Sequence, residues 1–479
     1  MRRRTKGNEL VKTRLIALFC VLGLVASACG SRLSEDELAT GGGTGGGGVS
    51  QSSGGRGTEG AGIDNSSDQG PKIGSLPVSC GAAPKGETLA APTAGDPGVT
   101  VDTIKIGVIT DNVSFIKLPT ASIAESVQAF VDFCNGFGGI NGRKLELTKL
   151  DSKLSEHLAA TKAACEGGLF ALVGSGAVFD DKGAQAMVDC QLIEVPAYTV
   201  TAAKGMSDRV FAPIPNPSDA INIGPAQYVK KQYPEAIRKA AILHGDVPSV
   251  TIQADRVKEA YESEGYDFVY DKTTGAIQES YTSEVKAMKD AGVEYLTMVS
   301  ATDEVVKLLR DMKTQGFAPE IVDLGQQYYD PGLLEEPGSE GAIVQLNTAP
   351  FEEAKQSPAL AAYLEAYDAV GSDIEATSLG VQAFSAGLLF ATAAKAAGPD
   401  LSRDKVLAEL EKIKEWDGGG LHFQTDPGDN AVSTCFSYAV VKDAKFVRLQ
   451  PKKVGQFDCS KDYALKLEGD YGTGAKASG

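Results

Sequence analysis

The stretch FVDFCNGFGGINGRKLEL, residues 130–147, decides the fold of this 479-residue chain. It begins in an amphipathic helix that the spacing of apolar residues predicts over 120–137, and it ends in a strand predicted over 144–151. The glycines between them suit a helix end and a tight turn, because both need the positive φ that glycine adopts readily. A helix is therefore followed at once by a strand, as in a β-α-β unit.

The alternation of strands and helices continues on both sides of this stretch. The first cycle adds strands at 104–109, 171–175, 194–199 and 210–214 and helices at 155–165 and 182–190. The second cycle has strands at 239–245, 266–274, 295–301, 321–326 and 342–347 and helices at 218–232, 250–263, 281–291 and 303–314. Three helices (357–369, 376–396, 402–414) and a hairpin (435–441 with 445–449) close the chain. The rhythm predicts an α/β fold with two parallel sheets, and a chain that crosses between two lobes more than once.

The first residues have the pattern of an export signal. A basic stretch precedes the apolar run Leu15–Ala26, which is too short to span a bilayer comfortably. Ala26-Ser27-Ala28-Cys29 resembles a bacterial lipobox, so we expect residues 1–28 to be a lipoprotein signal peptide and Cys29 to be lipidated. The alternative is an ordinary secretory signal cut near Ala28 with Cys29 unmodified. Residues 29–98, rich in Gly and Ser, are expected to form a flexible tether.

Charge and composition exclude several classes of function. Removing residues 1–28, which carry six Lys or Arg and one Glu, takes the formal charge from −17 to about −22. Such an acidic chain is a poor partner for nucleic acid or for an anionic lipid surface. The three histidines (His157, His244 and His422) lie far apart, and no Gly-x-Ser-x-Gly elbow precedes a helix, so catalysis is not expected.

Six cysteines follow Cys20 and Cys29: 80, 134, 165, 190, 435 and 459. An even number in an exported protein favours three disulfides, and none of the spacings is typical of a zinc site. No metal or other cofactor is therefore expected. Six cysteines allow fifteen pairings, which the spacing alone leaves open.

Residues 130–147 resemble the first helix, glycine turn and second strand of type I periplasmic binding proteins of the branched-chain amino acid and amide class. Further segments resemble this family in the expected order: ALVGSG at 171–176 its third strand and ligand loop, VPAYT at 195–199 its fourth strand and loop, KAAILH at 239–244 the start of its second lobe, and 378–397 its long helix after a hinge. The resemblance covers about residues 100–460.

The resemblance implies two doubly wound parallel-sheet lobes joined by three crossings, with the ligand in the cleft between them. Lobe 1 would comprise 99–219 and 350–425, lobe 2 would comprise 220–349 and 426–462, and 463–479 would be a flexible tail. Parallel sheets also bind ligands at the carboxyl ends of their strands.

The family's ligand-binding positions map onto loops after these strands. In lobe 1 they are Asn112, Ser114 and Phe115 beside Asp111, then Ser175, Gly176 and Ala177, then Ala197, Tyr198 and Thr199. In lobe 2 they are His244, Ser300, Thr302, Gln326, Gln327 and Tyr328. Several have alternative roles: Ser175 and Thr199 as helix caps, Tyr328 and Tyr329 as packing residues, and His244 as a structural hydrogen-bonding group.

One departure from the family concerns the ligand. Amino-acid binders carry an acid in the loop after the last parallel strand of lobe 2, where it pairs with the ligand ammonium. Here that loop reads Gly325-Gln326-Gln327-Tyr328-Tyr329. A neutral amide cannot offset the desolvation of an ammonium. We therefore expect a ligand without an α-ammonium, or one paired with a shifted acid, Asp330 or Asp303; amides, small acids and aromatic compounds stay open.

The sheet order that the resemblance implies, 2-1-3-4-5, also indicates the disulfides. It places the second and third helices side by side, with Cys165 and Cys190 near matching ends. The first helix lies on the other face, which leaves Cys134 for Cys80 in the segment before the first strand. Cys435 and Cys459 remain, near the closing hairpin.

The function that the resemblance implies is capture of a small polar or aromatic solute (an amino acid, amide or small acid) for the permease of an ABC importer. The protein would act on the outer face of the cell membrane, held there by its lipid anchor alone. The alternative is a ligand-sensing protein of the same fold that signals to a membrane receptor.

Overall fold

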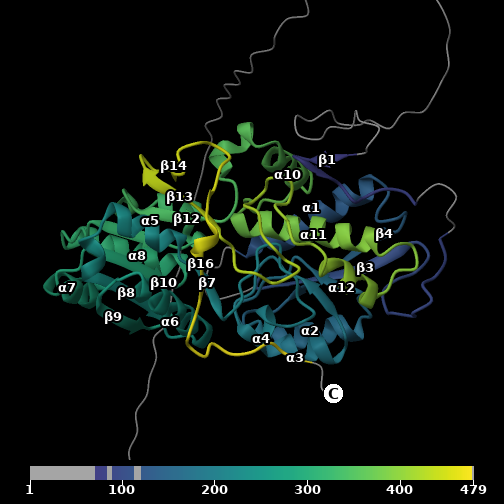
Figure 1. The fold of residues 1–479 in the computed structure, drawn as a ribbon, viewed down its shortest axis with the longest axis horizontal. Helices are drawn as coiled ribbons and strands as arrows, with labels where there is room; N and C mark the ends of the chain where they lie inside the picture. Colours follow the sequence, from purple (N-terminus) through teal and green to yellow (C-terminus); the bar gives the residue numbers. More distant parts are fainter. Residues whose placement is uncertain (1–70, 84–88, 113–119, 477–479) are drawn as a thin grey trace, which may run out of the picture. The chain divides into compact units, whose positions relative to one another are not determined.

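The computed structural model describes residues 71–83, 89–112 and 120–476. The expected signal peptide, Cys29 and residues 29–70 of the expected tether lie outside these ranges, as do Ser114 and Phe115. Two α/β lobes make up the described chain (Figure 1).

Lobe 1 is built on a four-stranded parallel sheet of order β4-β3-β5-β6. Its strands are β3 (Thr103–Thr110), β4 (Lys144–Asp151), β5 (Ala171–Val173) and β6 (Ile193–Val195). β5 and β6 are buried along their whole length, which is why their sequences are continuously apolar or carry a paired charge. The order is the 2-1-3-4 part of the expected arrangement.

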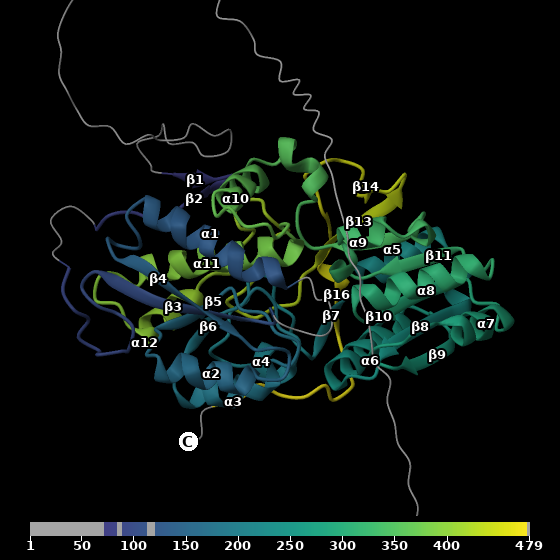
Figure 2. The same ribbon diagram turned by 180° about the vertical axis from the view of Figure 1, so that it is seen from behind.

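Helices cover both faces of this sheet. α1 (Ala121–Gly136) and α11 (Ser378–Ala396) lie on one face, and α2 (His157–Glu166) and α3 (Asp181–Asp189) lie on the other (Figure 2). α4 (Ala202–Gly205), α10 (Pro358–Asp368) and α12 (Arg403–Leu410) complete the lobe. α11 is long and apolar enough to cross a membrane, but 83% of its most apolar window is buried inside the protein. It is the core helix of lobe 1.

Lobe 2 is built on a larger sheet of order β14-β13-β12-β11-β10-β8-β9, with β15 paired to β13. Its parallel strands are β8 (Ala240–Gly245), β9 (Phe268–Thr274), β10 (Tyr295–Val299), β11 (Ile321–Leu324) and β12 (Ile343–Leu346). β13 (Cys435–Lys442), β14 (Lys445–Gln450) and β15 (Asp458–Cys459) add antiparallel pairs. α5 (Gly224–Gln232) and α6 (Pro248–Ser263) cover one face, while α7 (Thr282–Asp290), α8 (Thr302–Thr314) and α9 (Pro331–Leu334) cover the other.

The chain crosses between the lobes before α5, after β12 and before β13. The first crossing contains a short strand, β7 (Ala220–Asn222), in place of the first turns of the helix expected over 218–232. Asn222 ends that strand, because its side-chain oxygen accepts a hydrogen bond from the N–H of Gly224 at 2.8 Å. Gly224 begins α5, and Pro225 lies in the first turn of that helix.

The C-terminal segment is not the flexible tail that the sequence suggested. β16 (Ala464–Lys466) pairs antiparallel with β7, so it packs against the first crossing. The chain then returns to lobe 1, where Ala475 N–H donates to the carbonyl of Ala203 at 2.9 Å. Residues 464–476 therefore make a fourth passage between the lobes, because an unpaired edge strand in the hinge accepts the chain end as its partner.

The last part of the expected tether is also packed. β1 (Lys72–Ile73) and β2 (Leu76–Pro77) form a small hairpin, and Ile73 is fully buried. Asp96 accepts a hydrogen bond from the N–H of Arg403 at 2.8 Å. The disulfide Cys80–Cys134 fastens this segment to α1, and its presence explains why a sequence of low complexity is held on the domain.

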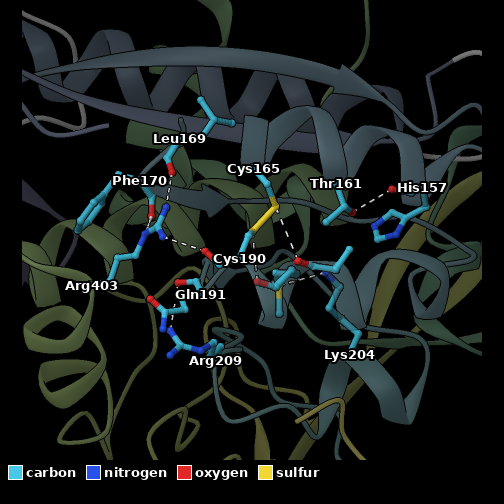
Figure 3. Close-up of a disulfide and its surroundings, with 12 residues drawn as sticks. His157, Thr161, Cys165, Leu169, Phe170, Cys190, Gln191, Lys204, Arg209 and Arg403 are labelled. Atoms are coloured by element: carbon cyan, nitrogen blue, oxygen red, sulfur yellow. Dashed lines mark hydrogen bonds between the residues drawn. A yellow bond between two sulfur atoms is a disulfide. The ribbon is translucent and has the colours of Figure 1, made fainter. Parts of the chain in front are cut away.

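The structure has the three expected disulfides. Cys80–Cys134 is joined by Cys165–Cys190, between the ends of α2 and α3, and by Cys435–Cys459, between paired positions of β13 and β15. Figure 3 shows Arg403 beside Cys165–Cys190, with its guanidinium turned toward the loops that follow α2 and α3. The guanidinium donates to three carbonyl oxygens, those of Leu169 (2.6 Å), Phe170 (3.0 Å) and Cys190 (3.1 Å).

Replacing Arg403 with lysine is expected to lower the free energy of unfolding by about 1.5–3 kcal/mol, because an ammonium cannot reach three carbonyls arranged for a planar fork. Arg403 is 6% exposed, so water cannot replace the lost bonds. Urea unfolding under non-reducing conditions measures the effect. Arg209→Lys is the matched control, since Arg209 donates to a single carbonyl of the same region, that of Gln191. Equal losses in the two variants would contradict this role of Arg403.

Candidate functional site

A cavity of about 420 Å³ lies between the two lobes. Its wall comes from the carboxyl-end loops of both sheets and from the crossings, and every described residue of the wall is apolar or carries an uncharged polar side chain. Cavities of this kind in open α/β sheets are the usual place for small ligands.

Lobe 1 contributes a wall that rests on two buried carboxylates. The wall residues are Thr120, Val178, Tyr198, Thr199, Val200, Leu379 and Gln382. Asp111 accepts a hydrogen bond from the N–H of Val178 at 2.8 Å, and Asp180 accepts one from the N–H of Val200 at 2.8 Å. Burial raises the pKa of Asp180 to about 6, although hydrogen bonds from Thr201 and Val200 oppose the rise. These two aspartates fix the loops without facing the cavity.

Tyr198 covers the loop that was expected to hold the ligand in lobe 1. A side-chain carbon added at Gly176 would lie 2.3 Å from Cε1 of the Tyr198 ring, so the ring packs directly on Gly176. The N–H of Gly176 donates to Ile109 O at 2.9 Å, and the N–H of Ala197 donates to Ser175 O at 2.8 Å. The tyrosine therefore forms the wall, and the backbone donors behind it are already paired.

Lobe 2 contributes residues of α6, the end of β10 with the loop after it, the loop after β11, and the end of β12 with the loop after it. The wall residues here are Ser249, Val250, Gln253, Val257, Tyr261, Thr297, Met298, Val299, Ser300, Ala301, Thr302, Gly325, Gln326, Gln327, Gln345 and Asn347. β8 and β10 are neighbours in the sheet, with Val299 opposite His244. Because both strands are followed by helices, α6 and α8 begin side by side at the cavity.

Both of these helices begin without a side-chain cap. The N-cap positions hold Val247 and Ala301, whose side chains have no oxygen to accept from the first-turn N–H groups. The hydroxyl oxygens of Ser249 and Thr302, in those first turns, are buried and have no hydrogen-bond partner in the described protein. Unpaired buried hydroxyls are unfavourable, so their place at a cavity wall calls for a partner inside it.

One hydrogen bond joins the lobes across the cavity. Gln382 on α11 donates through Nε2 to Oε1 of Gln326, which begins the short 3₁₀ helix Gln326–Tyr328, at 3.2 Å. Both glutamines line the cavity. Gln326 therefore lines the cavity and also contacts the other lobe. A change in the distance between the lobes would alter the cavity wall at this residue.

A buried aspartate lies behind the lobe-2 wall. Asp323 on β11 accepts hydrogen bonds from the hydroxyls of Tyr295 and Tyr438, each at 2.9 Å, and the wall residue Gln345 approaches it at 3.5 Å. Burial raises the pKa of Asp323 to about 7, and the three hydrogen bonds oppose the rise. Near neutral pH this carboxyl is therefore partly protonated.

The raised pKa of Asp323 predicts a pH dependence of stability. Between pH 4 and 7 the folded protein keeps a proton that the unfolded chain has lost, so stability falls as the pH rises toward 7. Asp323→Asn resembles the protonated form and does not titrate, so the variant lacks this pH-dependent contribution to the free energy of unfolding. From pH 5 to pH 8 the unfolding free energy of the wild type should fall by about 2–3 kcal/mol relative to the variant, at about 1.4 kcal/mol per pH unit. Urea unfolding of both proteins at the two pH values measures this, and parallel pH curves would contradict it.

Six of the expected site residues line the cavity: Tyr198, Thr199, Ser300, Thr302, Gln326 and Gln327. Asn112, Ser175, Gly176, Ala177, Ala197, His244 and Tyr328 do not, and Ser114 and Phe115 are outside the described residues.

Other contacts explain why four of these seven described residues stay behind the wall. Ser175 Oγ accepts from the N–H of Ile109 at 3.1 Å, Asn112 N–H donates to Asp151, and His244 is buried beside Thr251 and Thr273. Tyr328 is fully buried, and its hydroxyl accepts from Ser300 N–H at 2.8 Å. Tyr329 stacks on Phe351, so these two tyrosines support the wall from behind.

The wall residues that the sequence argument missed include two groups. Ser249, Val250 and Gln253 belong to the first two turns of α6, and they follow β8 as Thr302 follows β10, so the argument from strand ends applies to them as well. The second group comes from the crossings: Ile214, Pro215, Asn216, Ile221, Asn222, Pro225, Phe423, Val432, Ser433, Cys435 and Phe436. Nothing in their spacing indicated the cavity, because only the three-dimensional path of the crossings brings them together.

A buried serine and histidine lie close together without the features of a catalytic pair. Ser385 Oγ lies 2.9 Å from His422 Nε2, while His422 Nδ1 lies 2.7 Å from the carbonyl of Phe423 and Trp416 donates to Ser385 Oγ. His422 is 1% exposed, and burial lowers its pKa to about 4. The group is a saturated core network. Among the described residues there is also no cluster of His, Cys, Asp or Glu that could hold a metal.

A sequence model of the periplasmic binding protein family matches residues 103–445. The chain belongs to this family. No curated protein matches the sequence. The structure of this binding protein is similar to that of a leucine binding protein from Thermotoga maritima, with a TM-score of 0.61 and 16% identity over 75% of this chain and 99% of that one.

Two further solved structures widen the range of solutes. An ABC transporter solute binding protein from R. palustris, in complex with 4-hydroxybenzoate, has a TM-score of 0.62 and 17% identity over 77% of this chain and 99% of that one. A fatty acid ABC transporter substrate-binding protein from Thermomonospora curvata has a TM-score of 0.63 and 18% identity over 83% and 97%. At these identities the likeness shows the fold, the type I periplasmic binding protein fold, and the solute has to be argued from the cavity.

Proposed function

We propose that this chain is the solute-binding subunit of an ABC importer, and that it holds a small solute in the cavity between its lobes. The observation that carries the proposal is the cavity itself, which is lined by loops of both lobes and by the crossings that join them. A ligand that contacts both lobes stabilises the closed arrangement, and the permease then recognises the loaded protein by its closed form.

We also propose that the protein works outside the cytoplasm as a lipoprotein anchored through Cys29. The sequence Ala26-Ser27-Ala28-Cys29 after a basic and apolar stretch supports this, as do three disulfides, which persist in oxidising compartments. Cys29→Ser is expected to release the protein into the medium, whereas Cys20→Ser, inside the signal, should leave it on the membrane. Membrane retention of the Cys29→Ser protein would refute the anchor.

The test of solute binding begins with native mass spectrometry of the purified full chain, which identifies a co-purified small molecule. The same molecule is then added to the unloaded protein, and small-angle scattering is recorded. A rise in melting temperature together with a smaller radius of gyration is the expected result. A molecule that raises the melting temperature without compaction would contradict closure, and uptake that persists in cells without the protein would contradict the importer role.

A further inference from the structure

The cavity wall is rich in uncharged hydrogen-bonding groups. Primary amides come from both lobes and from the crossings, and among them are Gln253, Gln327, Asn347 and Gln382. Hydroxyls come from Thr199, Ser300 and other wall residues, and valine, isoleucine and phenylalanine side chains lie between them. Amides and hydroxyls can match the donors and acceptors of a ligand, while the apolar parts match its carbon skeleton.

The charges behind the wall disfavour an anion. Asp111 and Asp180 lie beneath the lobe-1 loops, and Asp323 lies beneath Gln345 in lobe 2. The buried cation near the crossings, Arg256, is already bound by the carbonyls of Pro217 and Ala220 and by Asn216. Its Nε has no hydrogen-bond partner, but Arg256 does not line the cavity. An anion in the cavity would therefore meet carboxylates behind both walls, and no described residue of the wall itself carries a positive charge.

A cation fits the wall no better. The carboxylates behind it are occupied by N–H or hydroxyl donors of the loops that they hold, and none of them lines the cavity. An ammonium would lose its water and gain only neutral dipoles, which offset little of the desolvation of a full charge. The wall is therefore matched to an uncharged molecule.

The unpaired hydroxyls of Ser249 and Thr302 indicate where such a molecule would be held. Each is at most 8% exposed, each lines the cavity, and each begins a helix of lobe 2 whose first N–H groups have no side-chain cap. Hydroxyls and helix N-termini both favour a hydrogen-bond-accepting oxygen. α6 and α8 have 16 and 13 residues, so their dipoles are well developed.

We propose that the cavity takes an uncharged solute and that Ser249 and Thr302 bind an accepting oxygen of it, such as the oxygen of an amide or ester carbonyl. This inference rests on the proposed function, because it names the class of solute for the same cavity. It also assigns the polar group of the solute to lobe 2, since Tyr198 covers the corresponding loop of lobe 1.

Matched compounds that differ only in charge test the proposal. The probes are 4-methylpentanamide, 4-hydroxybenzamide and octanamide, each beside the acid and the amine of the same skeleton, measured by thermal shift and calorimetry at pH 7. In a parallel arm, the protein is incubated with a small-molecule extract of culture medium, and the enriched compounds are identified by mass spectrometry. We expect at least one amide to bind tenfold or more tightly than its matching ions, or an enriched compound without an ionised group.

Charged compounds that bind more tightly than their amides, or an ionised compound as the enriched one, would overturn the inference and leave the proposed function intact. No binding by any probe together with no enriched compound would contradict the proposed function and the inference with it.

Variants of the two hydroxyls separate binding from folding. Ser249→Ala and Thr302→Val should each weaken the best-binding probe about 3- to 10-fold, the effect of one lost hydrogen bond. The melting temperature without ligand should not fall, because neither hydroxyl has a partner inside the protein. Ser263→Ala and Thr314→Val, at the far ends of the same helices, are the matched controls. Unchanged affinity in both wall variants would overturn the assignment of Ser249 and Thr302.

Discussion

Replacing Lys204 with methionine is expected to lower the free energy of unfolding by about 3–5 kcal/mol, the range for breaking a buried ion pair by removing one partner. Lys204 on α4 donates to Glu194 on β6, and both side chains are only 2% exposed. Methionine keeps most of the volume of lysine, and Met187 already lies against the ammonium at 3.5 Å. The loss therefore reports the carboxylate of Glu194 left unpaired, with little contribution from a cavity.

A double-mutant cycle measures this prediction. Thermal and urea unfolding are compared for Lys204→Met, Glu194→Leu and the double variant. The double variant should recover most of the stability, because two apolar side chains pack where two charges were held. Lys286→Met is the matched control: its pair with Asp290 is 70% and 66% exposed, so the change should be within about 0.5 kcal/mol. A loss below about 1 kcal/mol for Lys204→Met would show that water reaches Glu194.

The same pair connects the core of lobe 1 to the cavity. α4 begins directly after Thr199 and Val200 of the wall, and Asp180 holds the N–H groups of Val200 and Thr201. Loss of Lys204 removes a positive charge that favours the ionised form of Asp180. We therefore expect the Lys204→Met protein to bind ligand more weakly even at temperatures where it stays folded.

The regular part of the fold could be predicted from the sequence because it depends on local periodicity. α6, expected over 250–263, spans Pro248–Ser263, and α8, expected over 303–314, spans Thr302–Thr314. Where tertiary contacts decide, the sequence prediction was wrong: β7 replaces helical turns because β16 pairs with it, and residues 71–83 are ordered by Cys80–Cys134. β16 lies far along the chain from β7, and Cys80 and Cys134 are 54 residues apart, so no local pattern could reveal either contact.

The same distinction between local pattern and tertiary contact applies to the residues of the candidate site. Residues directly after parallel strands, such as Thr199, Ser300 and Gln326, were found because the strand end fixes their position. Ser175 and Tyr328 lie behind the wall because their hydroxyls accept hydrogen bonds from backbone N–H groups of neighbouring strands and loops, a contact that depends on the final packing. The position of the Tyr198 ring over Gly176 likewise decides which loop faces the cavity, and it cannot be derived from spacing.

Leucine, isoleucine and valine are expected to bind no tighter than about millimolar, which is about a thousandfold more weakly than amino acids held by an ion pair. Losing such a pair removes a few kcal/mol of binding free energy, and about 1.4 kcal/mol corresponds to a tenfold change in affinity. Gln326 and Gln327 line the cavity where an acid would be required. Neither of the shifted acids lines it: Asp330 accepts from the N–H of Gly332 at the start of α9, and Asp303 is exposed on α8.

Gln326→Glu supplies the missing charge with little change in shape. A glutamate at this position can still accept the hydrogen bond from Gln382, so the contact between lobes is kept. Calorimetry with leucine should show an affinity at least tenfold higher for the variant than for the wild type, because the ammonium gains a carboxylate partner in a partly buried cavity. Gln315→Glu, which adds the same charge at the end of α8 away from the cavity wall, should leave leucine binding unchanged. Sub-micromolar binding of leucine or valine to the wild type would show that another acid meets the ammonium, and the reading of the cavity as a site for uncharged solutes would then fail.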